Sequence, residues 1–366
     1  MIYTSTDTTE TPSGKIPAIK LDRFRLDRCY PLRFANLSTG EHFTIALSSL
    51  DVNGEGSPLY KVDVGGDFHS PSLGLYNLDR LKFGVDGGLG WDSSHPSELE
   101  LRQFKLFADF VSATVNAHVD LGHDIIVRDF DVDLGNMEIE RILSVIPDSI
   151  RNLYELGPDK FSTDIALSFK ARSTAPFNIT TDSIPSAELS LILDPGALNY
   201  GRADFKQVGG VINAVLRGND LDAATFSVED LTIEGPATEL HINGEVTRVR
   251  TDPLIMLDVK GSTKLQQLPV QLRRMVGGAL SGQINIDVNM LGTPSMLSRN
   301  NFHRLHVKGE VDGKDIFYLK ADTNTMVYTD RLSLKFGANE RFGHVDSLFT
   351  AVLKIDSTQI ITGDGA

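Results

Sequence analysis

Apolar and polar residues alternate in short runs along most of the chain, and Gly, Pro, Asn and Asp interrupt these runs at short intervals. Clear examples are residues 161–169, 240–246, 255–259 and 284–290. Alternation with a period of two is typical of a strand with one apolar face and one solvated face. Many short strands separated by turn residues predict a mainly β, antiparallel architecture.

Two segments have helical spacing instead. Asn136 is expected to cap a helix that begins at Met137, and a second short helix follows Pro147, so that helices occupy about 137–155. The segment 263–275 carries leucines on one helical face and predicts a further helix. Both helical segments are expected to be short amphipathic insertions in the β architecture.

A six-residue pattern recurs in which positions one, four and six are apolar. LDRFRL (21–26) and LDRLKF (78–83) show it most clearly, and it fits neither the period of a strand nor that of a helix. A β-bulge or short bend at the two central polar residues would put all three apolar side chains on one face. Bulges increase twist, so a long sheet of such units is expected to curl. The seven copies are 21–26, 47–52, 78–83, 101–106, 127–132, 228–233 and 302–307.

Longer stretches repeat as well. Residues 99–119 align with residues 226–246 without a gap, and apolar positions match along most of the alignment. Residues 143–151 match residues 265–273, and a similar strand follows each of them. The sequence therefore predicts internal repetition, as in an array of hairpin units.

These patterns predict an elongated, twisted antiparallel sheet or β-groove of repeated units. The expected parts are a flexible leader (1–14), a first β-repeat half that ends in the helices (15–160), a second half that contains the other helix (161–362), and a tail (363–366).

Charge and composition narrow the function. The net charge of −14 argues against a nucleic-acid binder and against binding of anionic lipid headgroups by a cluster of basic residues. Cys29 is the sole cysteine, which excludes an intrachain disulfide and a cysteine-based zinc site. No run reaches the roughly 18 apolar residues of a transmembrane helix. The polar start of the chain lacks the features of a signal peptide.

No catalytic or metal-binding pattern stands out. Asp129, Asp131 and Asp133 have the spacing of a calcium loop, but Leu134 occupies the place of the required glycine, and strict alternation favours a solvated strand face. Histidines lack zinc spacing, and no serine lies in a nucleophile elbow. A carbohydrate-active enzyme would concentrate carboxylates and aromatics, whereas the aromatics here are 8% and spread out. We therefore expect a protein that is not an enzyme and that uses no cofactor or metal.

The repeated pattern, with the helix-then-strand units, resembles the AsmA-like family, which includes TamB-type envelope proteins. Residues 229–246 and 276–295 carry the likeness most strongly. The resemblance implies a β-groove in the periplasm, tethered to the inner membrane by an N-terminal helix. It also implies movement of phospholipid between the inner and outer membranes and a role in outer-membrane lipid homeostasis. Because the chain lacks such a helix, the implied anchor would lie upstream of Met1.

The apolar face allows two interpretations. Phospholipid acyl chains could fill an open face, since each buried CH₂ contributes about 0.8 kcal/mol. Alternatively, a second sheet could cover the face, giving a structural or adhesive envelope protein with a closed core and no lipid. Ten residues are the candidates to line a groove: Leu78, Leu81, Phe83, Phe104, Leu106, Val115, Leu231, Ile233, Leu240 and Ile242.

Overall fold

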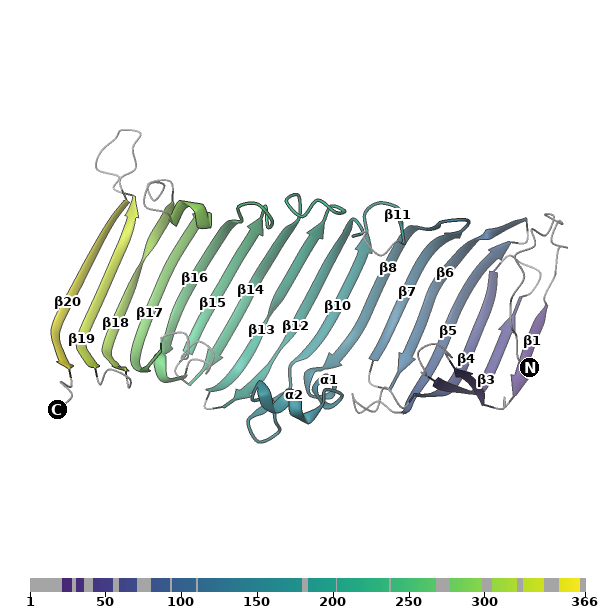
Figure 1. Cartoon of the computed structure of the whole chain (residues 1–366), viewed down its shortest axis with the longest axis horizontal. Helices are drawn as coiled ribbons and strands as arrows, with labels where there is room; N and C mark the ends of the chain where they lie inside the picture. Colours follow the sequence, from purple (N-terminus) through teal and green to yellow (C-terminus); the bar gives the residue numbers. More distant parts are fainter. Residues whose placement is uncertain are drawn as a thin grey trace.

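The computed structural model forms one long antiparallel sheet of 20 strands that does not close on itself (Figure 1). Strands make up 76% of it, and only two short α-helices are present in the described residues. The predicted mainly β fold is therefore confirmed. The described residues are 22–27, 31–35, 42–54, 59–70, 80–92, 94–109, 111–179, 184–201, 203–236, 238–267, 277–297, 305–320, 325–338 and 349–362.

The first half of the sheet leads to the helices. Its strands are β1 (Arg23–Asp27), β2 (Leu32–Ala35), β3 (His42–Asn53), β4 (Leu59–His69), β5 (Arg80–Asp92), β6 (His95–Ala108), β7 (Val111–Leu121) and β8 (Ile125–Glu138). The helices α1 (Ile139–Ser144) and α2 (Asp148–Leu153) follow at the lower edge of the sheet in Figure 1.

The second half continues the same sheet. Its strands are β9 (Phe161–Thr163), β10 (Ala166–Ser173), β11 (Phe177–Asn178), β12 (Ala187–Tyr200), β13 (Ala203–Leu216), β14 (Thr225–Gly235), β15 (Thr238–Thr247), β16 (Leu254–Lys264), β17 (Ala279–Gly292), β18 (His306–Lys320), β19 (Thr325–Ala338) and β20 (Phe349–Thr362). From β12 onward, each strand pairs with the next.

The sheet crosses the predicted boundary at residue 160 without a break. β8 pairs with β10, and Met137 lies opposite Leu167 in their register. At the far end of the first half, β1 and β2 both pair with β3. The predicted leader (1–14) and tail (363–366) lie outside the described residues.

The repeated six-residue pattern forms β-bulges. In β14, Val228 pairs with Gly244 and Leu231 pairs with Ile242, so that two residues face Asn243 alone. The copies at 47–52, 101–106 and 127–132 have the same two-against-one register in β3, β6 and β8. The prediction is confirmed for these four copies. The other three copies begin at positions 21, 78 and 302, which lie outside the described residues.

Two of these bulges have the same backbone conformation and the same side-chain hydrogen bond. Gln103 in β6 and Asp230 in β14 both have positive φ, 47° and 50°. The side-chain oxygen of Asn116 accepts a hydrogen bond from the Gln103 N–H at 2.7 Å, and that of Asn243 accepts one from the Asp230 N–H at 2.8 Å. This bond holds the bulge residue in its left-handed conformation. The match supports the predicted repetition of 99–119 in 226–246.

A glycine lies against each of these two bulges on the preceding strand. A Cβ on Gly87 would lie 2.7 Å from the Cα of Phe104, and a Cβ on Gly210 would lie 2.8 Å from the Cα of Leu231. Only glycine allows so close an approach of two backbones.

The helix predictions were partly wrong. Asn136 does not cap α1, because β8 continues to Glu138, which pairs with Ala166 and takes the N-cap position. In the predicted helix 263–275, the first two residues belong to β16 and Leu265–Gln267 form a 3₁₀ turn. Residues 268–276 lie outside the described residues.

The predicted single strand over 161–169 is also wrong. It divides into β9 and β10 because Asp164 and Ile165 belong to neither strand, and the Asp164 carboxylate accepts a hydrogen bond from the Ala197 N–H there. Ile165 is only 2% exposed and packs with Phe205 and Val208. Ile139 of α1 packs against this small buried cluster, while the other buried apolar residues of the described part, such as Val62 and Val127, lie outside it.

Candidate functional site: the concave apolar face

Apolar residues form a continuous line across the sheet, perpendicular to the strands. We call this line the apolar row. Register partners connect it from β1 to β18 with one glycine as the sole interruption. Its members are Leu26, Leu50, Val64, Val85, Leu106, Ala113, Leu134, Phe169, Leu191, Ile212, Val228, Gly244, Leu257, Met290 and Val307.

The apolar row is long. It crosses fifteen strands, and neighbouring strands lie about 4.8 Å apart, so its length is about 67 Å. Parallel rows flank it and extend to the far end of the sheet. One of them runs from Ile233 through Leu240, Ile286 and Val311 to Leu353 in β20. These rows together make one apolar face.

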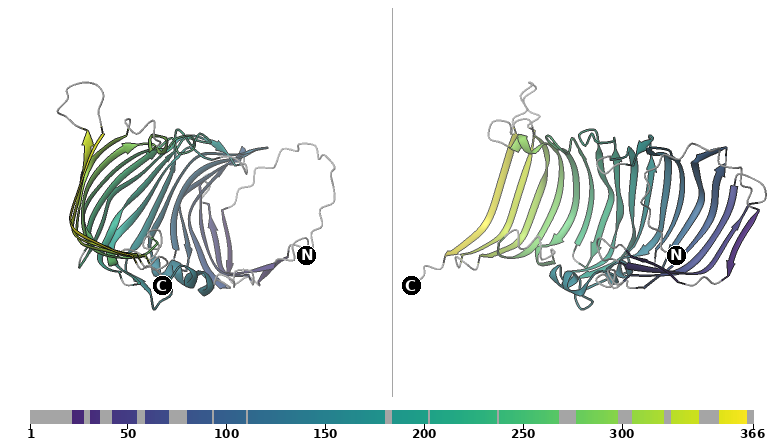
Figure 2. Two further views of the ribbon diagram at one scale, coloured as in Figure 1. Left: turned by 60° about the vertical axis from the view of Figure 1, so that its left-hand side comes forward. Right: turned by 45° about the vertical axis from the view of Figure 1, so that its right-hand side comes forward.

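The apolar face lines the inside of a trough. The backbone N–H of Ile179 donates to the C=O of Ile125, so the peptide groups of Ile125 point toward β11. For L-residues this fixes the side of the sheet on which the Ile125 side chain stands. In Figure 1, β8 runs downward to α1 and β10 lies on its left. For a strand in this direction whose Ile125 peptide groups point to the left, the L-configuration places the Ile125 side chain, and with it the apolar face, on the side toward the viewer. Figure 2 shows that the strands bend around this side, making it concave.

Nine of the ten predicted groove residues lie on this face, and Leu78 lies outside the described residues. Phe104 pairs with Val115, Leu231 with Ile242, and Ile233 with Leu240. Leu81 and Phe83 lie in β5 opposite Phe68 and Gly66, and Leu106 belongs to the apolar row. The bulges keep these residues on one side despite the change of phase in the sequence.

No second layer covers the apolar face in the described residues. None of their large side chains is less than 2% exposed, and Leu106 is 39% exposed. The chain exposes 24358 Å², whereas a compact monomer of 366 residues exposes about 14,000 Å². The interpretation as a closed sandwich is therefore wrong for this part of the chain.

The convex face carries charged pairs instead. Arg102 donates two hydrogen bonds of 2.7 Å to Glu100, and this contact holds the pKa of the Glu100 carboxyl below its usual value. Arg128 lies 3.2 Å from Glu98. Such exposed pairs contribute little to stability.

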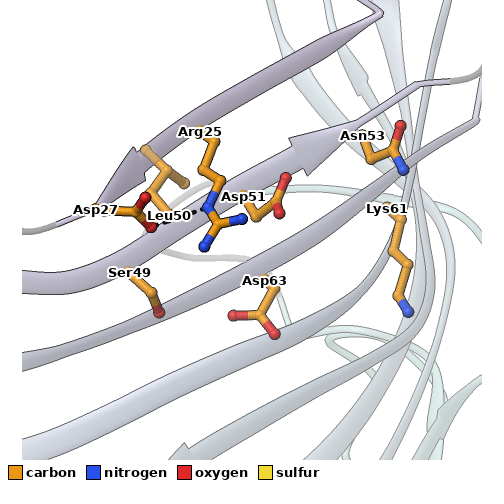
Figure 3. Close-up of a pocket in the computed structure, with 8 residues that line it drawn as sticks. All are labelled: Arg25, Asp27, Ser49, Leu50, Asp51, Asn53, Lys61 and Asp63. Atoms are coloured by element: carbon orange, nitrogen blue, oxygen red, sulfur yellow. Dashed lines mark hydrogen bonds and ion pairs between the residues drawn. The ribbon is translucent and has the colours of Figure 1, made fainter.

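Shallow depressions lie between these polar side chains. One of about 350 Å³, shown in Figure 3, is lined by Arg25, Asp51, Lys61 and Asp63 together with Asp27 of β1 and Ser49, Leu50 and Asn53 of β3. Its lining contains both carboxylates and cations, so it does not present a single sign of charge.

The acidic residues that resembled a calcium loop lie on strand β8. Asp131 faces Asn116 of β7, and Asp133 forms a 3.4 Å ion pair with Lys170. Among the described residues, no three carboxylate, histidine or cysteine side chains are grouped to hold a metal ion. Asp129 and Asp131 are exposed on β8, as the interpretation of this segment as a solvated strand face predicts.

Sequence reasoning missed the part of the face in β10, β12 and β13. Phe169, Leu191 and Ile212 join the two halves of the apolar row. The alternation at 187–193 contained the signal, but that segment carries no copy of the six-residue pattern.

Comparisons with protein-family models, curated proteins and solved structures give no match for this chain. In the part of the chain that the structure describes, no helix is long and apolar enough to cross a bilayer. The function is therefore inferred from the geometry of the apolar face.

Proposed function

We propose that the apolar face binds the acyl chains of phospholipids and that the protein conducts phospholipid along the trough between the inner and outer membranes. The observation that carries this proposal is the apolar row on the concave side, which only Gly244 interrupts and which no protein layer covers in the described residues. An uncovered apolar surface of this size marks a binding site.

The dimensions and chemistry of the trough suit acyl chains. A chain that spans half of a bilayer core is about 15 Å long, so a row of about 67 Å offers room for several chains in succession. Acyl chains have no polar groups that need partners, and each CH₂ removed from water contributes up to about 0.8 kcal/mol. The open side of the trough leaves a polar headgroup in water, where its solvation is retained.

The resemblance to the AsmA-like family supports the same proposal. It implies a curled β-groove, and the observed sheet is elongated and curled (Figure 2). The periplasmic location, the inner-membrane anchor upstream of Met1 and the role in outer-membrane lipid homeostasis are parts of the proposal that come from this resemblance.

Two measurements test binding and conduction separately. Native mass spectrometry of the purified full chain is expected to show bound phospholipid that organic extraction removes. A transfer assay between phospholipid vesicles is then expected to show that the chain accelerates exchange of a fluorescent phospholipid.

A pair of neighbouring substitutions in β12 distinguishes conduction from mere binding. Leu191→Glu places a carboxylate in the middle of the apolar row, whereas Ser190→Glu places one on the convex face. We expect Leu191→Glu to reduce transfer about tenfold or more while lipid still binds on either side, since a charge on an apolar path is strongly unfavourable. Equal transfer by both variants would exclude conduction along the row, and lipid-free wild-type protein would exclude the whole proposal.

A further inference from the structure

The last strand of the sheet has a long apolar edge. β20 pairs with β19 on one side, and no described residue pairs with its other side. Five of its large side chains are between 47% and 65% exposed: Val352, Leu353, Ile355, Ile360 and Ile361. Such an edge presents unpaired N–H and C=O groups, and it pairs readily with another strand.

The other end of the sheet is protected. β1 and β2 contain five and four residues, and they share β3 between them. Arg23, Arg25 and Asp27 occupy alternate positions of β1. Short, charged edge strands discourage pairing, so the two ends differ in their capacity to bind a strand.

β20 also contains the feature of the repeated pattern, namely a shift by one residue in the alternation of side chains between the two faces. We call this shift the phase change. Ser357 has a φ of 51°, and the register with β19 places both Ile355 and Thr358 opposite apolar-face positions, Leu332 and Thr329. The β19–β20 ladder passes through this region without a shift, so the phase change of one strand lies opposite that of the other.

This phase change makes β20 complementary to itself. When two copies of β20 are antiparallel with their phase changes opposite, Leu353 faces Ile360 of the second copy on the concave side. Val352 then faces Ile361 of the second copy on the convex side. Lys354 faces Gln359, so no like charges oppose each other. Cross-strand apolar pairs of this kind stabilise a sheet, and like charges would weaken it.

We propose that β20 pairs with β20 of a second copy of this chain across a two-fold axis, joining two sheets into one with a continuous concave apolar face. Such isologous pairing of one surface with itself forms C2 dimers, the commonest symmetry among soluble homo-oligomers.

The convex side of β20 favours a second copy over an unrelated strand. Val352 and Ile361 lie on the mostly polar convex face, so they do not line the groove. Their β19 neighbours are Lys335 and Met326, respectively. On the same face, the exposed residues Met256 and Leu291 lie opposite each other on adjacent strands. The two-fold axis would give Val352 an apolar partner, Ile361 of the second copy, where β19 supplies only Lys335.

Charge substitutions on the convex side test the pairing without touching the groove. Sedimentation of the full chain, stripped of lipid, is expected to show a dimer. Val352→Lys with Ile361→Lys opposes lysines at two symmetric places and is expected to weaken association about tenfold or more. Val352→Glu with Ile361→Lys pairs opposite charges and is expected to restore the dimer. Met256→Lys in β16 is the control and should leave the dimer unchanged.

A crosslink tests the register. In a Cys29→Ser background, Val352→Cys with Ile361→Cys is expected to give an intermolecular disulfide, and neither cysteine alone should do so, because the register joins position 352 to position 361. A monomeric wild-type chain, a lysine variant as dimeric as wild type, or crosslinking by a single cysteine would overturn the proposal. Lipid content is measured separately, so this result is independent of the proposed function.

Discussion

The concave and convex faces of this sheet share one backbone, but they differ in whether their side chains have favourable partners. On the convex face, carboxylates such as Glu100 lie beside cations such as Arg102, and both groups remain in water. On the concave face, Leu106 and its neighbours in the apolar row are half-exposed, and no described residue packs over them. Only the concave face would gain much free energy from a bound apolar molecule.

The difference also shows where the stability of the fold comes from. The described part of the chain has one small buried cluster, around Ile165. Elsewhere the sheet depends on its hydrogen-bonded ladders and on cross-strand pairs, each of which contributes roughly 0.2–1 kcal/mol. The following predictions test this view of the two faces.

The largest expected effect is at Ile165. Ile165→Ala should lower the free energy of unfolding by about 3 kcal/mol, because the side chain is 2% exposed and the cavity would not be refilled. Leu106→Ala on the open apolar face should cost only about 1 kcal/mol, because much of that side chain is already in water. Urea unfolding of both variants measures the difference. Equal losses would mean that the apolar face is packed like a core.

The next effect distinguishes two glycines of β5. Gly87→Ala should cost about 2 kcal/mol, since its Cβ would press on the Cα of Phe104 in the bulge. Gly84→Ala should change stability by less than about 1 kcal/mol, because the nearest atom, on the Phe107 side chain, is at an ordinary distance of 3.5 Å. Thermal unfolding of the two variants compares them directly. A harmless Gly87→Ala would contradict the role assigned to this glycine.

Removing either asparagine that holds a bulge should have a smaller effect. Asn116→Ala and Asn243→Ala each remove a hydrogen bond to a backbone N–H, at an expected cost of about 1 kcal/mol. The two sites share no contacts, so the losses should add in the double variant. Denaturant unfolding of the three variants checks this. A double variant that loses no more than one single variant would show that the repeats do not act independently.

The smallest effect is on the convex face and depends on pH. Arg102 lowers the pKa of Glu100 from its ordinary value of 4.5, so the pair stabilises the fold at neutral pH and loses its effect as the pH falls through the lowered pKa. Arg102→Ala should lower the free energy of unfolding only slightly at pH 7, because both side chains are exposed and the pair is screened by solvent. The cost should disappear once the pH is well below that lowered pKa.

A matched variant isolates this pair. In a Glu100→Gln background, Arg102→Ala should have the same small effect at both pH values, as measured by urea unfolding. A pH-dependent effect that persists in this background would assign it to another carboxylate.

Much of the fold was predictable because the local patterns agree with one another. The alternation at 240–246 became β15, and the phase change at 228–233 became a bulge, since two polar residues between apolar ones cannot otherwise keep one face apolar. The predicted helix start at Asn136 was wrong because the β8–β10 ladder continues past this residue, although asparagine is a good N-cap. Tertiary pairing there overrides local propensity.

Whether the apolar face is open or covered could not be predicted from alternation, because an inward-facing leucine has the same pattern in both cases. The glycines opposite the bulges were missed because their role depends on a strand that is remote in sequence, as with Gly210 and Leu231. The edge of β20 was missed because Thr358 takes an apolar place in the repeated pattern. These features depend on which strands become neighbours.

The most direct test of lipid binding compares two adjacent residues of β16 on opposite faces. Leu257 belongs to the apolar row, whereas Met256 lies on the convex face and is 46% exposed. Native mass spectrometry of Leu257→Glu, Met256→Glu and wild-type protein measures the bound phospholipid, and circular dichroism confirms that all three retain the sheet. We expect wild type and Met256→Glu to carry equal amounts of phospholipid and Leu257→Glu to carry much less. Equal amounts on all three proteins, or none on wild type, would contradict binding on the concave face.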